Sequence, residues 1–119
     1  MAELSLTYQA RTYSSGTAGR SICNARSHHW VSDSPGGEAP GAGEFFCASM
    51  AACAVNMVER IARTENRALG SMEVNVAVYT DKDKTPGEVS TYDAARVKFE
   101  MWGVSDDDAK YLVKVWKQR

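Results

Sequence analysis

The chain has 119 residues, of which 44% are hydrophobic and 24% are charged, and its net charge is −1 at pH 7. This length suits a single domain over residues 1–119, and the composition is ordinary for a globular protein. The Lys and Arg residues are scattered, which argues against a nucleic-acid or membrane-binding surface. A domain of this size has little apolar burial to spare, so association with a second copy would stabilise it.

The N-terminal residues lack the basic stretch and apolar core of a signal peptide. The longest uncharged run, residues 45–58, is shorter than the about 20 residues of a transmembrane helix. We therefore expect a cytoplasmic protein with no membrane span. Three cysteines, an odd number without zinc-ligand spacing, predict neither a disulfide framework nor a metal site. The glycine-rich stretch lacks a phosphate-loop pattern, so no cofactor is expected.

The first third of the chain has strand and turn patterns. Residues 3–13 alternate apolar and polar side chains, which predicts a half-buried strand. Residues 14–19 have the composition of a turn, and residues 20–32 are typical of extended segments. Residues 32–43 hold two prolines and four glycines, which predicts a loop.

A long helix is predicted over residues 44–63, where no Gly or Pro interrupts a run of good helix formers. Its first half is apolar or small on every side, and charges return only at Glu59. A helix that is apolar all round needs burial all round, which a monomer of this size supplies poorly. The pattern therefore favours a homodimer in which the partner covers this helix.

The remaining residues predict two more strands and a second helix. Residues 72–80 and 92–102 alternate in the manner of strands, and residues 81–88 between them have the composition of an exposed turn. Ser105 with the acids that follow it is a helix N-cap. Apolar residues then recur at helical spacing up to Trp116. Strand groups separated from helices favour an α+β fold.

Two segments together resemble the OsmC/Ohr family. Residues 26–38 contain an R-x-H start and D-x-P followed by Gly-Gly, and residues 43–53 place an acid and two bulky apolar residues before Ala-Ala-Cys. The similarity covers about residues 4–119. It implies an α+β fold with an antiparallel sheet and a long central helix, formed as an intertwined homodimer. Many members are thiol-dependent peroxidases that reduce organic hydroperoxides in stress responses, and others have no known activity.

The resemblance implies that Cys53 occupies the position of the peroxide-attacking cysteine. A free thiol has a pKa of about 8.5 and lies too far from the helix N-terminus here, so its ionisation needs a cation. Family members use an arginine from the first strand, held by a glutamate at the start of the long helix. By place in the chain these are Arg11 and Glu44, although Glu44 lies one residue after the matching position. Arg20 and Arg26 are alternative cations.

A second thiol is where the sequence departs from the family pattern. The peroxidases carry it just past the last helix, and this chain stops at residue 119. We expect either that the C-terminal end is truncated relative to the family or that two-cysteine turnover is absent. Cys47 lies six residues before Cys53, about 9 Å along the helix, which is beyond disulfide reach. Cys23 remains an alternative, and turnover otherwise requires an external thiol reductant.

The helix side chains around the thiol predict a ligand pocket. Phe46, Met50 and Met57 would line a pocket for a small organic hydroperoxide, or they would serve as core packing. Two alternative functions stay open: a non-enzymatic homodimer that binds a small apolar ligand, and a degenerate, inactive member. His28 and His29 point to opposite faces of a strand, so they do not share a metal.

Overall fold

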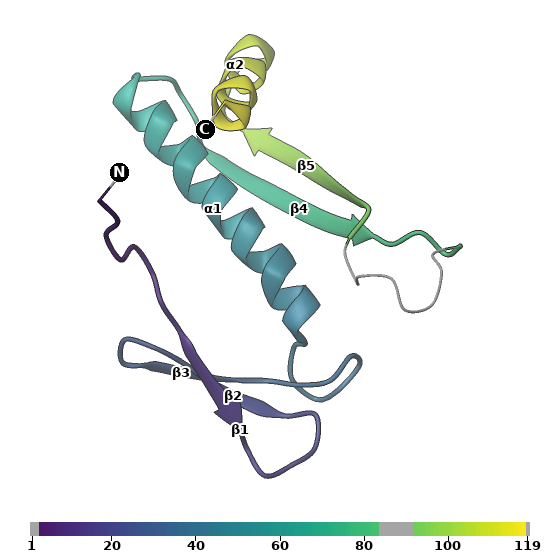
Figure 1. Ribbon diagram of the computed structural model, residues 1–119. Helices are drawn as coiled ribbons and strands as arrows, with labels where there is room; N and C mark the ends of the chain where they lie inside the picture. Colours follow the sequence, from purple (N-terminus) through teal and green to yellow (C-terminus); the bar gives the residue numbers. More distant parts are fainter. Residues whose placement is uncertain (1–2, 84–91, 119) are drawn as a thin grey trace. The chain divides into compact units, whose positions relative to one another are not determined.

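The computed structural model describes residues 3–83 and 92–118 (Figure 1). The chain divides into two compact units, Met1–Phe45 and Phe46–Arg119. The single domain expected from the chain length stays a prediction.

The first unit is built on a three-stranded antiparallel sheet in the order β1-β2-β3. Its strands are β1 (Arg11–Ser14), β2 (Ser21–Ala25) and β3 (His28–Ser32). Arg11 pairs with Asn24 and Ser14 with Ser21, and Ala25 pairs with His28 across a two-residue turn. The extended segments expected over residues 20–32 are therefore confirmed.

The strand expected over residues 3–13 is shorter than predicted and begins only at Arg11. Residues 3–10 are exposed and lie outside the strands of the described chain, although their side chains alternate. Leu4 and Tyr8 are 94% and 91% exposed. The physical reason is that β2 ends at Ala25, one residue past the Arg11–Asn24 pair, so residues 3–9 have no residue of β2 opposite them. An alternating pattern becomes a half-buried strand only where a sheet offers it an edge.

The long helix is α1 (Ala42–Thr64), which begins two residues before the predicted start. Glu44 accepts a hydrogen bond from the Gly41 backbone N–H at 3.1 Å, the acid half of a capping box. Asn66, with φ 53°, follows the helix in the left-handed conformation, and the Arg67 N–H donates to the Ala62 carbonyl at 2.8 Å. Both ends of α1 thus have partners for backbone groups that a helix leaves unpaired.

The second unit contains a β-hairpin and two helices. Strands β4 (Ser71–Tyr79) and β5 (Ala94–Trp102) pair antiparallel over their full length, and α2 (Asp106–Lys117) follows. The Ser105 side chain accepts a hydrogen bond from the Asp108 N–H, which confirms the predicted N-cap. Residues 84–88 of the expected turn lie outside the described residues.

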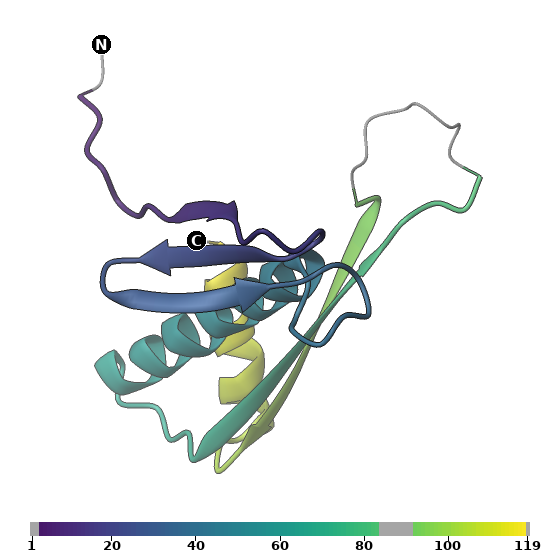
Figure 2. The same ribbon diagram turned by 90° about the horizontal axis from the view of Figure 1, so that it is seen from below.

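Both helices cover the same face of the β4–β5 hairpin (Figure 2). Val58 of α1 and Leu112 of α2 are fully buried. Val58 and Leu112 belong to one hydrophobic core, and three hairpin residues pack against it: Met72, Phe99 and Met101. Met72 pairs with Met101, so these side chains share one face of the sheet.

Only one side of α1 is buried within a single chain. Ala54 and Val58 have no exposed surface, whereas Ala52 and Cys53 are exposed. Among the described residues, α1 is also the one helix whose length and composition match a membrane span. The core helix of a soluble protein passes the same test, so this match is a weak indication.

Candidate functional site

Cys53 lies halfway along α1, with its side chain exposed. It occupies the side of the helix that the core of the second unit leaves open. Met50 and Met57, one helical turn before and after it, are half-buried. Met57 packs against the core, while Phe46 is 45% exposed and its ring lies 5.4 Å from that of Tyr92. Met57 therefore contributes to core packing. The role of Phe46, Met50 and Met57 as a ligand pocket stays a prediction.

All three cysteines are free thiols. Cys47 is half-buried in the same helix as Cys53, and Cys23 is buried in β2 of the first unit. The helix is continuous between Cys47 and Cys53, so these two residues are separated by about 9 Å along the helix axis. Cys47 therefore cannot form a disulfide with Cys53 of its own helix.

Arg11 and Glu44 both belong to the first unit. The Arg11 guanidinium lies over the Tyr13 ring, 4.6 Å from its centroid, and Glu44 caps α1 through Gly41. No ion pair joins Arg11 to Glu44 in the part of the chain that the structure describes. Since Cys53 belongs to the second unit, its pairing with either residue stays a prediction.

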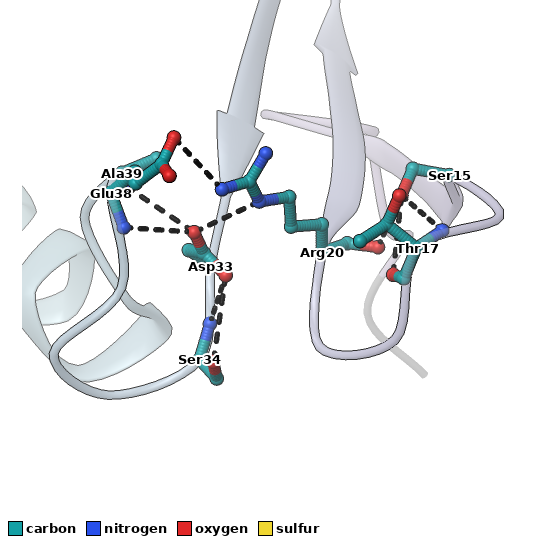
Figure 3. Close-up of polar contacts among 7 residues, drawn as sticks. All are labelled: Ser15, Thr17, Arg20, Asp33, Ser34, Glu38 and Ala39. Atoms are coloured by element: carbon teal, nitrogen blue, oxygen red, sulfur yellow. Dashed lines mark hydrogen bonds and ion pairs between the residues drawn. The ribbon is translucent and has the colours of Figure 1, made fainter.

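Arg20, an alternative cation, is engaged within its own unit. Its Nε atom lies 3.1 Å from Asp33 Oδ2, and its Nη2 atom lies 3.1 Å from Glu38 Oε2 (Figure 3). The Ser15 hydroxyl donates to the Arg20 carbonyl at 2.9 Å and fixes the turn before β2. A guanidinium held by two carboxylates is a structural ion pair, which makes Arg20 a poor partner for a thiolate.

Asp33 is a residue whose importance the sequence reasoning missed. Its carboxylate accepts hydrogen bonds from the backbone N–H groups of Ser34, Glu38 and Ala39, at 2.8, 3.1 and 3.4 Å (Figure 3). The Ser34 N–H is the main cause that lowers the Asp33 pKa below 3.8, assisted by Ala39 and Arg20 and opposed by burial. The available signal was an Asp ahead of Ser-Pro-Gly-Gly, since Asp side chains often bind the backbone of a following turn.

Gly37 shows how closely the loop wraps this carboxylate. A Cβ atom at position 37 would lie 2.5 Å from Asp33 Oδ2, so only glycine fits there without a shift. The Asp33 N–H also donates to the Pro40 carbonyl at 3.0 Å. The loop of residues 33–41 is therefore ordered by its own hydrogen bonds. It has a structural role, because it determines where α1 begins.

An apolar groove of about 570 Å³ lies in the second unit between β5 and α2. Phe99, Met101 and Val113 line it, together with Ala109. The polar lining residues are Lys110, Lys114, Lys117 and Gln118. The sequence predicts an apolar pocket beside Cys53 and not this groove, because the helical spacing of apolar residues in α2 does not show which of them stay uncovered.

Within residues 3–83 and 92–118, no group of three or more His, Cys, Asp or Glu side chains gathers in a way that could hold a metal ion. The Arg26 guanidinium contacts His28, with 3.1 Å between Nη2 and Nε2. His28 and His29 are both exposed on β3.

Comparison with known proteins identifies the fold. No protein-family model matches the sequence, and no curated protein matches it. The structure is similar to that of an OsmC-like protein from Mycoplasma pneumoniae, with a TM-score of 0.85 and 13% identity over 98% of this chain and 84% of that one. A second solved structure, described only as structural genomics, matches with a TM-score of 0.75 and 16% identity over 90% of this chain and 79% of that one. The chain thus has the OsmC/Ohr-like α+β fold that its sequence predicts.

Proposed function

We propose that this chain is a thiol-dependent hydroperoxide reductase in which Cys53 attacks the peroxide. The observation that carries the proposal is a free thiol halfway along the long helix of an OsmC/Ohr-like fold, on the side of the helix that the core of the second unit leaves open. Cys23, by contrast, is buried within its own unit, as structural cysteines usually are. We place the protein in the cytoplasm, where thiols stay reduced.

The proposed chemistry is a two-electron oxidation of sulfur. The Cys53 thiolate attacks one peroxide oxygen, an S–O bond forms and the O–O bond breaks. The leaving alkoxide takes up a proton and departs as an alcohol, and Cys53 becomes a sulfenic acid. Arg11 is proposed to favour the thiolate by its charge, because it has no carboxylate partner among the described residues. Glu44 is proposed to position Arg11, in addition to capping α1.

Turnover then needs a second thiol. Cys47 is out of reach on the same helix, and Cys23 is buried. We therefore propose that an external thiol attacks the Cys53 sulfenic acid, releases water and forms a mixed disulfide. A further thiol then displaces Cys53 and restores it.

Thiol titration after exposure to cumene hydroperoxide tests the proposal. We expect the wild type and Cys47→Ser to lose one thiol per chain on addition of the peroxide. Cys53→Ser should lose none under the same conditions. Equal thiol loss in Cys53→Ser, or no loss in the wild type, would contradict the assignment.

The groove between β5 and α2 favours a second candidate function, the binding of an apolar ligand without catalysis. Its Phe, Met and Val lining suits an alkyl chain, and the lysines suit an acidic end group. The three lysines that line the groove, Lys110, Lys114 and Lys117, have no ion-pair partner among the described residues. The occupant proposed here is therefore a long-chain carboxylate.

Calorimetric titration with dodecanoate tests this second candidate. Lys114→Glu should weaken binding several-fold, because it places a negative charge at the groove. Lys82→Glu, an equal charge change on a residue outside the groove, is the matched control and should bind like the wild type. A wild type that binds no dodecanoate would remove the candidate.

A further inference from the structure

The first unit contains a hollow that joins Arg11, which the proposed peroxidase chemistry uses, with residues that this chemistry does not use. Its volume is about 430 Å³, and it is lined by Gln9, Ala10, Arg11, Asn24 and Arg26. Its size lies within the range of small-ligand pockets, about 300–1,000 Å³. We propose that this hollow binds a phosphate group, held by the guanidinium groups of Arg11 and Arg26 and the amide of Asn24.

The sheet register brings these residues together. Arg11 and Asn24 are directly opposite each other in the β1–β2 ladder, and opposite residues point to the same face of a sheet. Arg26 follows β2 in the two-residue turn to β3. The three side chains therefore gather where β1 begins and β2 ends, and residues 9–10 complete the lining from the segment before β1.

The charge of the hollow is unbalanced. Arg11 contacts the Tyr13 ring and Arg26 contacts His28, and neither has a carboxylate within ion-pair distance among the described residues. Arg20, in the same unit, has two carboxylates. Two cations that line one hollow repel each other, and a bound anion would turn this repulsion into attraction.

Asn24 adds an unsatisfied donor. Its Nδ2 atom is buried and has no hydrogen-bond partner. Buried polar groups in native proteins nearly always have a partner in the protein or in ordered water, so the Asn24 amide has a hydrogen bond to offer to an acceptor from outside the chain. A phosphate oxygen is such an acceptor.

The backbone of Arg26 supports the same conclusion. Its φ is 54°, a left-handed conformation that favours glycine or asparagine over arginine. Glycine is the usual residue with positive φ in a two-residue hairpin turn. Residues held in uncommon backbone conformations cluster at functional sites, which is consistent with a binding role for Arg26.

A phosphate group fits these donors better than other anions. Guanidinium groups bind phosphate oxygens through pairs of parallel hydrogen bonds, and two cations match the double negative charge of a phosphate. The volume leaves room for an organic group, so the ligand is either a phosphate monoester or free phosphate. Binding at this hollow does not depend on Cys53, and it can therefore be tested apart from peroxide reduction.

Calorimetric titrations of the full chain with inorganic phosphate and with glycerol 3-phosphate, at ionic strength matched with sodium chloride, test the proposal. We expect saturable binding of at least one of them, and tighter binding of glycerol 3-phosphate would identify the ligand as a monoester. Arg26→Gln should weaken the affinity at least 10-fold. Arg63→Gln, an equal charge change on the exposed end of α1, should leave it unchanged.

A second variant separates binding from folding. Arg26→Gly relieves the strained φ, so we expect its thermal unfolding midpoint to equal or exceed that of the wild type while phosphate binding falls as in Arg26→Gln. Absence of saturable binding in the wild type would overturn the proposal. So would unchanged affinity in Arg26→Gly and Arg26→Gln.

Discussion

The carboxylate of Asp33 organises the loop before α1 through three backbone N–H groups and one guanidinium. We expect Asp33→Asn to lower the thermal unfolding midpoint by several degrees at pH 7, because the neutral amide loses the charge attraction of Arg20 and part of its accepting capacity. Asp107→Asn, an exposed acid at the start of α2, is the control and should change stability by no more than about 0.5 kcal/mol.

The lowered pKa of Asp33 adds a pH dependence with a defined sign. Since the folded pKa lies below 3.8, the unfolded chain binds more protons in acid than the folded one. The stabilisation by Asp33 is therefore complete well above pH 3.8 and is lost as the pH falls through the folded pKa. Urea unfolding of wild type and Asp33→Asn from pH 7 to pH 3 should show the two stabilities converging in acid. A constant difference across this range would contradict the role of the charge.

Glu44 has a structural role on which its proposed catalytic role would be superimposed, and two substitutions separate them. Glu44→Ala removes the acceptor for the Gly41 N–H and should destabilise the chain by about 1 kcal/mol. Glu44→Gln keeps an acceptor and should restore most of that stability. If Glu44 also positions Arg11, peroxide reduction should fall in both variants. Full activity in Glu44→Gln would limit Glu44 to capping.

At the scale of single residues, the sequence predicts where a residue lies in its helix or strand better than it predicts which side chain that residue contacts. Spacing along the chain identifies Cys53 as a mid-helix thiol and Ser105 as an N-cap, because both depend on neighbours within a few residues. The ion pair between Arg20 and Asp33 joins residues 13 positions apart. It depends on the turn conformation, so the sequence left Arg20 as a free cation.

At the scale of elements, periodicity predicts the helices and the β4–β5 strands to within two residues. The prediction is too long over residues 3–10, where alternation is present but no strand of the described chain pairs with these residues. Strand formation depends on a partner, whereas α1 satisfies its own backbone hydrogen bonds and carries its own capping residue. This difference explains why helix bounds were predicted more accurately than the first strand.

Leu112 is the residue through which α2 joins the core of the second unit. It has no exposed surface and packs with Val58 and Ile61 of α1. Leu112→Ala should cost about 3 kcal/mol of unfolding free energy, because it removes buried methyl groups and leaves a cavity. Urea denaturation followed by circular dichroism measures this loss. Lys110→Ala, on the exposed side of the same helix, should stay within about 0.5 kcal/mol of the wild type.

A polar contact also ties α2 to the end of α1. The Tyr111 hydroxyl donates to Glu65 Oε1 at 2.6 Å, and this bond is the main cause that raises the Tyr111 pKa above 10.0. Because the folded pKa is raised, the stabilisation is complete below pH 10.0 and is lost as the pH rises through the folded value. Denaturation between pH 8 and pH 11 should show a loss of stability that is smaller in Tyr111→Phe. An identical loss in both proteins would argue against the bond.

At the scale of the whole molecule, one chain leaves several apolar side chains bare. Leu4 and Leu6 are 94% and 73% exposed in the segment before β1, and Ala52 and Cys53 are exposed on α1. Exposed apolar surface on a helix that is apolar in composition indicates an interaction surface. A second copy of the chain is the partner we expect.

Light scattering at micromolar concentration should give a mass of about 26 kDa, twice the 13.0 kDa of one chain. In a two-fold dimer each surface residue occurs on both sides of the interface, so one substitution acts twice. Ala52→Glu would place two charges at the exposed face of α1 and should shift the mass to that of the monomer. Lys110→Glu on α2 is the control and should remain dimeric. A monomeric wild type would exclude the dimer, and a dimeric Ala52→Glu would place the interface elsewhere than on this face of α1.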